Sequence, residues 1–217
     1  MMDQYLEKLK VMETGAITDS LKLLHMNGWM LDMHPVNQTS FICGRAFTVE
    51  YKFDPDPDGT TLNYYELLDH IQPGDVIVLA ANNCPYALIG ENMQHASKKK
   101  GAAGIILDGK NRDTLTIKNY DQPVFSKGHE VRFMEKNQKI SAFNVPVMCA
   151  GTYVCPGDYI IGDADGVIAI PQNKIQAVLY QAERIMAIES HADEAIEQGA
   201  PMIEVKRILG EKKKIRV

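Results

Sequence analysis

The stretch from Asp75 to Asp113 constrains the fold more than any other part of the chain. The apolar run 76–80 is short, rich in β-branched residues and preceded by Pro73-Gly74, which predicts a buried strand. A second apolar run, 104–107, predicts another strand. Between the two, apolar residues recur at helical spacing and stop before Gly101: Leu88, Ile89, Met93 and Ala96. The stretch is therefore predicted to be a parallel, right-handed β–α–β unit in an α/β fold.

Chemically useful residues follow these two predicted strands. Ligands of parallel sheets bind beyond the carboxyl ends of the strands, and that edge is expected to carry Gly90 with the amides after it, then Asp108, Arg112 and Asp113. An amide-rich turn, a planar cation and an adjacent carboxylate suit an anionic substrate held together with a divalent metal ion. The alternative is that Arg112 and Asp113 form a structural ion pair in a loop.

The composition limits the classes of partner. A chain of 217 residues, 45% hydrophobic and 24% charged, fits one globular domain, expected over 1–217. A net charge of −5 argues against nucleic acid as a partner, and the two lysine runs, 98–100 and 212–214, are expected to be solvated. No apolar stretch approaches the roughly 20 residues that span a bilayer, which argues against a membrane protein. With no export signal and no CxxC pair, we expect four free cysteines and a cytoplasmic protein.

The rest of the chain predicts helices at both ends and strands between them. Residues 3–13 are expected to form a short helix, and a second helix is expected to follow, capped by Thr18 or Asp19 and ended by Asn27-Gly28. Alternation over 44–51 predicts a strand, and 173–198 predicts a long amphipathic helix closed by Gly199. The remaining tail is expected to fray. Pro-Gly-Asp occurs at 73–75 and 156–158, each time before a strand, which indicates repeated turn chemistry rather than duplication.

Several patterns suggest metal or catalytic groups but favour simpler interpretations. Residues 54–59 begin like a calcium-binding loop, yet the twelfth position is Tyr65 and two prolines interrupt it, which favours an acidic surface loop. The six histidines form no ligand-spaced pair, so a zinc site is not predicted. Asp163 and Asp165 are interpreted as turn formers. Lys127 is interpreted as a solvated lysine, and the alternatives are that it reaches a carboxylate or acts as a base.

An ordered set of short motifs resembles the RraA-like family, which includes the class II 4-hydroxy-4-methyl-2-oxoglutarate/4-carboxy-4-hydroxy-2-oxoadipate aldolases. The resemblance covers roughly residues 14–190. Its motifs are Thr18-Asp-Ser-Leu21, Gly44-Arg-Ala-Phe-Thr-Val49, Pro73-Gly-Asp-Val76, Gly90-Glu-Asn92, Gly101-Ala-Ala-Gly104, Asp108-Gly-Lys-Asn-Arg-Asp113, Pro123-Val-Phe125, Pro156-Gly-Asp158 and Gly162-Asp-Ala-Asp-Gly-Val167.

The resemblance implies a fold, an assembly and an activity. The implied fold is a swivelling phosphohistidine-domain-like βα fold, in a homotrimer or a dimer of trimers with sites near the subunit interfaces. The implied activity is that of a divalent-metal-dependent lyase acting on a 2-oxo acid through a metal-stabilised enolate. It would cleave a 4-hydroxy-2-oxo acid by a retro-aldol reaction that releases pyruvate, decarboxylate an acid such as oxaloacetate, or do both.

The resemblance also assigns residue roles. Arg112 would hold the substrate carboxylate, Asp113 would support Mg²⁺ or Mn²⁺, and the backbone amides of Gly90, Glu91, Asn92 and Met93 would face the pyruvate part. This agrees with general chemistry, because a guanidinium grips a carboxylate in a bidentate fork and Mg²⁺ prefers oxygen ligands and retained waters.

One departure from the family pattern leaves alternatives open. The aldolases usually continue Arg-Asp-x-x-Glu/Asp, whereas this chain has Thr116 in the last position. Glu91, Asp108 or a residue of another subunit would have to supply the second carboxylate. A related enzyme acting on a sugar-derived oxo acid is one alternative. The other is a non-catalytic regulator that binds and inhibits a ribonuclease E-type enzyme, because the family includes such proteins.

Overall fold

The computed structural model describes residues 3–37, 41–54 and 62–215, and the chain divides into two units. One unit is the continuous segment Gly28–Gln172, and the other joins residues 1–27 to Asn173–Val217. None of the helices in the described ranges combines the length and the apolar character needed to cross a bilayer. Only part of the predicted acidic loop 54–59 can be assessed, since residues 55–61 lie outside the described ranges.

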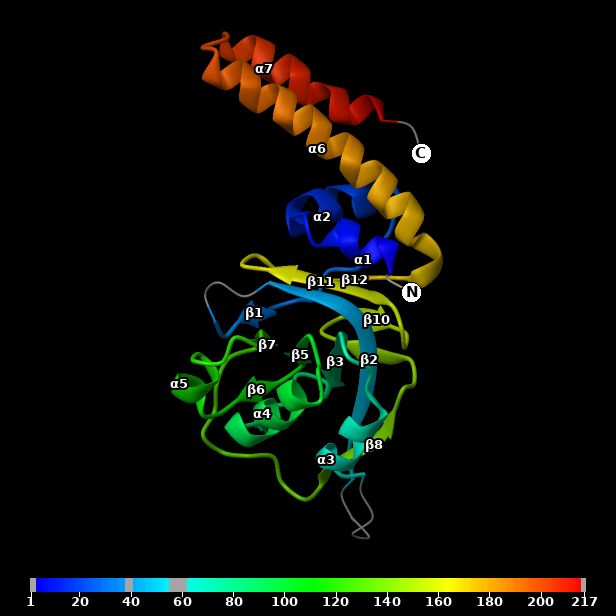
Figure 1. Cartoon of the computed structure of the whole chain (residues 1–217), viewed down its shortest axis with the longest axis vertical. Helices are drawn as coiled ribbons and strands as arrows, with labels where there is room; N and C mark the ends of the chain where they lie inside the picture. The colour runs from blue at the N-terminus through cyan, green and yellow to red at the C-terminus, as the bar shows by residue number, and fades with distance from the viewer. Residues whose placement is uncertain (1–2, 38–40, 55–61, 216–217) are drawn as a thin grey trace. The chain divides into compact units, whose positions relative to one another are not determined.

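The segment 28–172 is built on a mixed sheet in which β1-β7-β5-β3-β2-β11-β12 are neighbours in that order (Figure 1). β7, β5, β3 and β2 run parallel, and β8 pairs with the second half of β2. Two small sheets, β4–β6 and β9–β10, complete the unit. The strands are β1 (His34–Pro35), β2 (Ile42–Phe53), β3 (Asp75–Ala80), β4 (Ala87–Ile89), β5 (Gly104–Leu107), β6 (Lys110–Asn111), β7 (Val124–Ser126), β8 (Gln138–Phe143), β9 (Val147–Cys149), β10 (Thr152–Val154), β11 (Tyr159–Asp163) and β12 (Gly166–Ile170).

The central strands are apolar on both faces because both faces are covered. Ile77 and Leu79 of β3 pack into one core, whereas Val76 and Val78 pack into a second core on the opposite face. This alternation is expected of a strand whose successive side chains point to opposite sides. The predicted strands 76–80 and 104–107 are confirmed as β3 and β5, and they are parallel.

The helix predicted between these strands is only partly correct. Leu88 and Ile89 belong to β4, and the helix α4 (Glu91–Lys99) begins after Gly90. A buried pair of apolar residues fits a strand as well as a helix, so spacing alone could not separate the two. Three other short helical segments belong to this unit: α3 (Tyr64–Leu67), the 3-10 helix η1 (Leu68–His70) and α5 (Thr114–Ile117).

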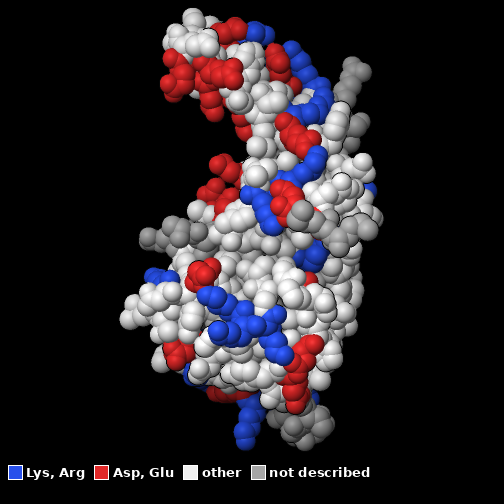
Figure 2. Space-filling view, in the orientation of Figure 1, with Lys and Arg blue, Asp and Glu red and all other residues white. Residues whose placement is uncertain are grey.

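The lysine run 98–100, which ends α4, lies on the surface, as predicted. Figure 2 shows basic side chains gathered over α4. Lys98 pairs with Asp121 and Lys100 pairs with Asp69, so two of the three lysines in the run have carboxylate partners.

The two Pro-Gly-Asp sequences form the same turn, which confirms the predicted repeat of turn chemistry. Gly74 and Gly157 have φ angles of +92° and +80°, in the left-handed region that favours glycine. Asp75 accepts a hydrogen bond from the amide of Gln72, and Asp158 accepts one from the amide of Cys155, three residues back in each case. Asp163 and Asp165 also form a turn, since the Asp163 carboxylate accepts the Asp165 amide between β11 and β12.

The other unit is helical. It contains α1 (Gln4–Leu9), α2 (Thr14–Leu23), α6 (Ile175–Glu197), α7 (Met202–Leu209) and the 3-10 helix η3 (Gly210–Lys214), while the 3-10 helix η2 (Gln172–Lys174) precedes α6. The long helix and its end before Gly199 are confirmed. The predicted cap is wrong, because α2 starts at Thr14 and Thr18 and Asp19 lie inside it. The tail is not frayed over α7, whose Val205 and Ile208 pack with Ala192 of α6.

Candidate functional site

The residues predicted to form a site are brought together by the chain just after β5. β6 leads from Lys110 to Asn111, and the amide of Arg112 then donates to the carbonyl of Ile89, 3.0 Å away, at the end of β4. Asp113 follows with φ 55° and ψ 34° and is the N-cap residue of α5. Residues other than glycine populate this left-handed conformation sparsely, but aspartate and asparagine adopt it more readily than most.

Gly90 lies against both side chains, and this close approach explains why it is a glycine. A Cβ atom at Gly90 would lie 2.3 Å from Oδ2 of Asp113 and 3.1 Å from Nε of Arg112. The φ of Gly90 is −129°, which any residue can adopt, so the requirement is for space and not for backbone freedom. The structure thus places the start of α4 directly beside Arg112 and Asp113.

The first turn of α4 offers free amides at this position. The amide of Glu91 donates to Oδ2 of Asp113 across 3.1 Å. The amides of Asn92 and Met93 precede the first intrahelical bond, which runs from Gln94 to the carbonyl of Gly90, and they have no partner among the described residues. The unpaired N–H groups of Asn92 and Met93 can therefore bind a negatively charged group at the helix start. The Glu91 amide, which was also expected to face the substrate, is instead bonded to Asp113.

Arg112 and Asp113 form a loose pair. Nε of Arg112 lies 3.7 Å from Oδ2 of Asp113, with 44% and 39% of the two side chains exposed. Such a half-exposed contact contributes little to stability, which weakens the interpretation as a structural ion pair. The guanidinium carbon lies 4.7 Å from the centre of the Phe133 ring, a cation–π contact that orients the guanidinium while leaving its N–H groups available.

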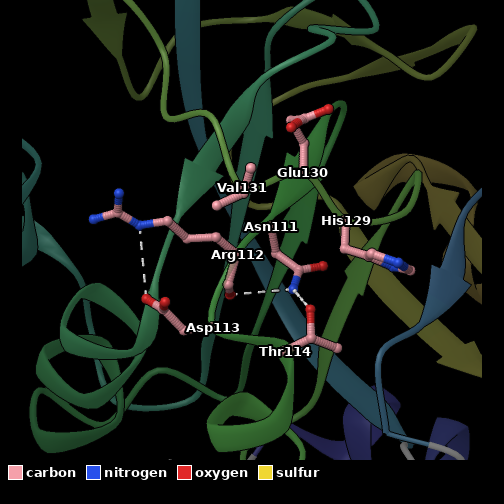
Figure 3. Close-up of a pocket in the computed structure, with 7 residues that line it drawn as sticks. All are labelled: Asn111, Arg112, Asp113, Thr114, His129, Glu130 and Val131. Carbon is pink, nitrogen blue, oxygen red and sulfur yellow. Dashed lines mark hydrogen bonds and ion pairs between the residues drawn. The ribbon is translucent and has the colours of Figure 1, made fainter.

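A cavity of about 320 Å³ opens beside the pair, and its seven lining residues are labelled in Figure 3. The side chains of Arg112 and Asp113 extend to one side of it, and that of His129 extends to the other (Figure 3). No motif in the sequence marks His129 or Glu130 as a site residue. The only available signal was their position shortly after a predicted strand, since β7 ends at Ser126.

Asp108 and Lys127 are not part of this group. They pair with each other across 3.1 Å, and both line a second cavity that shares no residue with the first. Asp108 therefore does not supply the carboxylate that the Thr116 position lacks. The interpretation of Lys127 as a solvated lysine is wrong, because only 13% of its side chain is exposed, and the alternative that it reaches a carboxylate is confirmed. All four cysteines are free, as predicted.

The residues around Asp113 fit a hard cation that keeps most of its waters. In the described part of the chain no three His, Cys, Asp or Glu side chains cluster as metal ligands. The Asp113 carboxylate uses Oδ2 for the Glu91 amide, and Oδ1 has no partner within the described residues. Mg²⁺ is commonly held by one or two carboxylates together with water and substrate oxygens, so this donor set is compatible with Mg²⁺ or Mn²⁺ and not with a structural zinc ion.

Comparisons with known proteins agree with this architecture. A "Putative 4-hydroxy-4-methyl-2-oxoglutarate aldolase" of Halalkalibacterium halodurans is 31% identical over 193 residues, which cover 88% of each protein. A crystal structure of an uncharacterized protein from Pseudomonas syringae pv. tomato superposes with a TM-score of 0.84 at 25% identity, over 95% of this chain and 98% of that one. The structure of Streptomyces coelicolor RraAS2, described as an unusual member of the RNase ES inhibitor RraA protein family, has a TM-score of 0.82 at 22% identity over 89% and 98% of the chains and supports the fold.

The expected fold is therefore confirmed, as a mixed α/β unit with helices from both ends of the chain. The family model RraA-like (Aldolase/RraA) matches residues 14–169, which is most of the chain. Together with the relative from Halalkalibacterium, this match shows that the chain belongs to the RraA-like family.

Proposed function

We propose that this protein is a divalent-metal-dependent carbon–carbon lyase that acts on a 2-oxo acid. The reaction is retro-aldol cleavage of a 4-hydroxy-2-oxo acid, releasing pyruvate, with decarboxylation of an oxaloacetate-type acid as a related activity of the same site. The observation that carries the proposal is the meeting of one guanidinium, one carboxylate and the free amides of a helix start around Gly90. The name of the relative from Halalkalibacterium supports the same class of reaction.

Arg112 binds the carboxylate of the substrate. Its guanidinium is held over Phe133 and only loosely engaged by Asp113, so paired N–H groups remain for a bidentate contact. A lysine has the same charge but lacks the planar fork. The orientation of the oxo acid therefore depends on Arg112 in particular.

The amides of Asn92 and Met93 stabilise the charge that develops on the pyruvate part. When the C3–C4 bond breaks, its electron pair becomes part of an enolate, and fixed N–H dipoles near the enolate oxygen lower its energy. A divalent ion held through Asp113 would add Lewis-acid stabilisation of the same oxygen when it is bound. The enolate is then protonated at C3 to give pyruvate.

The hydroxyl proton on C4 needs an acceptor. His129 and Glu130 line the same cavity as Arg112, and they carry groups that can take a proton. A base must come within hydrogen-bond reach of the proton that it removes. We assign this role to one of these two residues, and the pH profiles of kcat for His129→Gln and Glu130→Gln identify which.

The test is the release of pyruvate, followed by coupling to lactate dehydrogenase and NADH. The substrates are oxaloacetate and 4-hydroxy-4-methyl-2-oxoglutarate, each with Mg²⁺, with Mn²⁺ and with EDTA. Asp113→Asn is the sharpest variant, because asparagine tolerates the left-handed conformation and keeps one oxygen for the Glu91 amide. We expect metal-dependent turnover in the wild type and a loss of at least about 100-fold in the variant. Equal turnover in EDTA would overturn the proposal.

A second candidate function is regulation of a ribonuclease E-type enzyme by binding. It is favoured by the structural likeness to RraAS2, a member of an inhibitor family by its description. The absence of metal-dependent pyruvate release from both substrates, together with co-purification of the ribonuclease from the native host, would support this function over the first.

A further inference from the structure

A second cavity lies at the carboxyl edge of the parallel strands, and neither Arg112 nor Asp113 is among its lining residues. Its volume is about 320 Å³. Its residues come from the ends of β2, β3, β5 and β7, from β9 and from the β9–β10 turn: Glu50, Tyr51, Lys52, Ala80, Asn82, Asn83, Asp108, Lys127, Val147, Met148, Ala150 and Gly151. The crevice beyond the carboxyl ends of parallel strands is the preferred ligand position in open α/β sheets.

Strand register creates a buried ion pair in this cavity. Leu107 of β5 lies opposite Ser126 of β7, so the next residues, Asp108 and Lys127, leave the sheet side by side. Nζ of Lys127 lies 3.1 Å from Oδ1 of Asp108, and the two side chains are 13% and 4% exposed. Their alignment falls short of a hydrogen bond, so Oδ1 is charge-paired but accepts no hydrogen bond from the described residues.

A buried carboxylate oxygen without a hydrogen-bond donor is costly, and a ligand can supply the missing donor. The other carboxylate of the cavity is already satisfied, because Glu50 accepts from the Ser141 hydroxyl at 2.7 Å and pairs with Lys52 at 2.9 Å. The ammonium of Lys127 has three N–H donors and, within the described residues, Asp108 as its charged partner. Unused hydrogen-bonding capacity in the cavity lining therefore lies at Asp108 and Lys127, and also at the buried Tyr51 hydroxyl, which has no partner among the described residues.

The surroundings limit the chemistry of the ligand. Two lysines face two carboxylates, so the cavity favours neither a metal ion nor a multiply charged anion. Asn82 and Asn83, at φ 50° and 55°, hold exposed side-chain amides at the rim, and Val147 and Met148 add an aliphatic wall. The ligand that complements these groups is a small monoanion with a hydroxyl group and a short carbon skeleton.

We propose that this cavity is a second ligand site, selective for a small hydroxy acid. The carboxylate of the ligand contacts the ammonium of Lys127 and an amide of Asn82 or Asn83, and its hydroxyl donates to the Asp108 carboxylate, whose Oδ1 is covered by Lys127. The site shares no lining residue with the Arg112 cavity, so it does not depend on the lyase function proposed above.

The experiment follows Met148, which lines the cavity and is 60% exposed, by NMR of protein labelled at the methionine methyl groups. Met148→Leu assigns its signal among the 11 methionines. The probe ligands are L-lactate, propionate, which lacks the hydroxyl, and 1,2-propanediol, which lacks the carboxylate. We expect lactate to shift the Met148 signal saturably with a Kd on the order of 1 mM, and each analogue to bind about tenfold more weakly or worse.

Variants separate this site from the first one. Arg112→Ala should leave the Met148 titration unchanged. Asn82→Gly removes a rim amide at a left-handed position that glycine adopts easily, and it should weaken lactate binding several-fold. Asp108→Leu/Lys127→Met removes both buried charges together, a change that proteins often tolerate, and should abolish the shift.

Three results would overturn the second site. The first is no movement of the Met148 signal up to about 0.1 M lactate, a concentration at which even weak specific binding is visible. The second is equal binding of lactate and propionate. The third is an undiminished shift in the folded double variant; if that variant does not fold, the analogue series and Asn82→Gly decide.

Discussion

The proposed active site has room for the Asp113 carboxylate because residue 90 is a glycine and has no Cβ atom. Because a Cβ at Gly90 would lie 2.3 Å from Oδ2 of Asp113, Gly90→Ala must displace the carboxylate or the start of α4. A misplacement of about 1 Å in a catalytic group can cost on the order of 100-fold in rate. We therefore expect kcat/KM for pyruvate release to fall by about that factor, with the secondary structure retained by circular dichroism. An unchanged kcat/KM in Gly90→Ala would show that the space at Gly90 is not needed for catalysis.

The matched control is Gly15→Ala, which makes the same chemical change in the helix α2. No heavy atom outside the helix's own backbone and its chain neighbours lies within 4 Å of a Cβ built there. Alanine is the better helix former, so the free energy of unfolding should rise by about 0.5–1 kcal/mol, measured by urea unfolding. Its pyruvate release should equal that of the wild type, and a loss of activity in both glycine variants would remove the steric explanation.

The sequence predicted correctly which site residues lie together, but it did not predict how deeply individual side chains are buried. Gly90, Arg112 and Asp113 were expected together from their places after neighbouring strands, and they lie in contact. Lys127 was misinterpreted because nothing in its local sequence reports that Asp108, 19 positions earlier, is its neighbour. That neighbour is fixed by the β5–β7 register, and register depends on contacts distant in the sequence.

Among the elements, the Pro-Gly-Asp turn before β3 has a predicted pH signature. Burial raises the pKa of the Asp75 carboxyl above its ordinary 3.8, against the opposing effects of the Gln72 amide and Arg45. The folded state then holds this proton more tightly than the unfolded state. The free energy of unfolding from this carboxyl is highest below pH 3.8 and falls as the pH rises through the raised pKa.

Asp75→Asn removes this titration while keeping an oxygen for the Gln72 amide. The variant should gain stability relative to the wild type as the pH rises from about 3 to about 7, measured by urea unfolding at each pH. A difference between variant and wild type that is constant over this range would contradict the pKa shift. Arg45→Lys, which removes the guanidinium but keeps the charge, should leave the direction of the trend intact.

The helix α7 provides a second test at this scale. Ile208 is 2% exposed and packs with Val205 and with Ala192 of α6. Truncation to alanine in such a small cluster should cost about 2–5 kcal/mol. By hydrogen exchange, the amides of α7 should lose protection in Ile208→Ala while those of β3 and β5 keep theirs. Ile203→Ala is the control, because Ile203 is 73% exposed on the same helix and should change little.

Helices and strands were predicted correctly where the apolar pattern fitted only one type of secondary structure. The prediction failed where the pattern fitted both a helix and a strand, or neither. The runs at β3 and β5 are too short for helices and are bounded by Gly or Pro, so they were assigned correctly. Leu88 and Ile89 matched a helical period by chance, and α7 was missed because lysines and glutamates dominate the tail around it. Its apolar stripe has meaning only against α6, which the sequence alone does not show.

For the whole molecule, the untested expectation is assembly into a homotrimer or a dimer of trimers. Val131, which lines the first cavity, is 85% exposed, and Leu115, next to the lining residue Thr114, is 82% exposed. Large exposed apolar side chains beside a site are typical of an interface. For a chain of 24.2 kDa we expect light scattering to give a threefold or sixfold mass, and Val131→Asp to lower both the mass and the activity.

The control for this substitution is Val11→Asp, since Val11 is also highly exposed, at 76%, but belongs to the helical unit. It should leave the mass and the turnover unchanged. A monomeric wild type with full activity would show that the cavity is complete within one chain, and the proposed trimer would then be wrong.

The strand β2 also has a consequence for the protein during its synthesis. One edge of β2 pairs with β3, which follows soon after, but the other edge pairs with β8 and with β11, which begins at Tyr159. A ribosome must add more than a hundred residues after Ile42 before that second edge is covered. During that interval a nascent chain exposes a 12-residue strand edge, the kind of surface that pairs with other chains. The strand that joins the parallel and antiparallel parts of the finished sheet thus presents an unpaired edge prone to misassembly before the chain is complete.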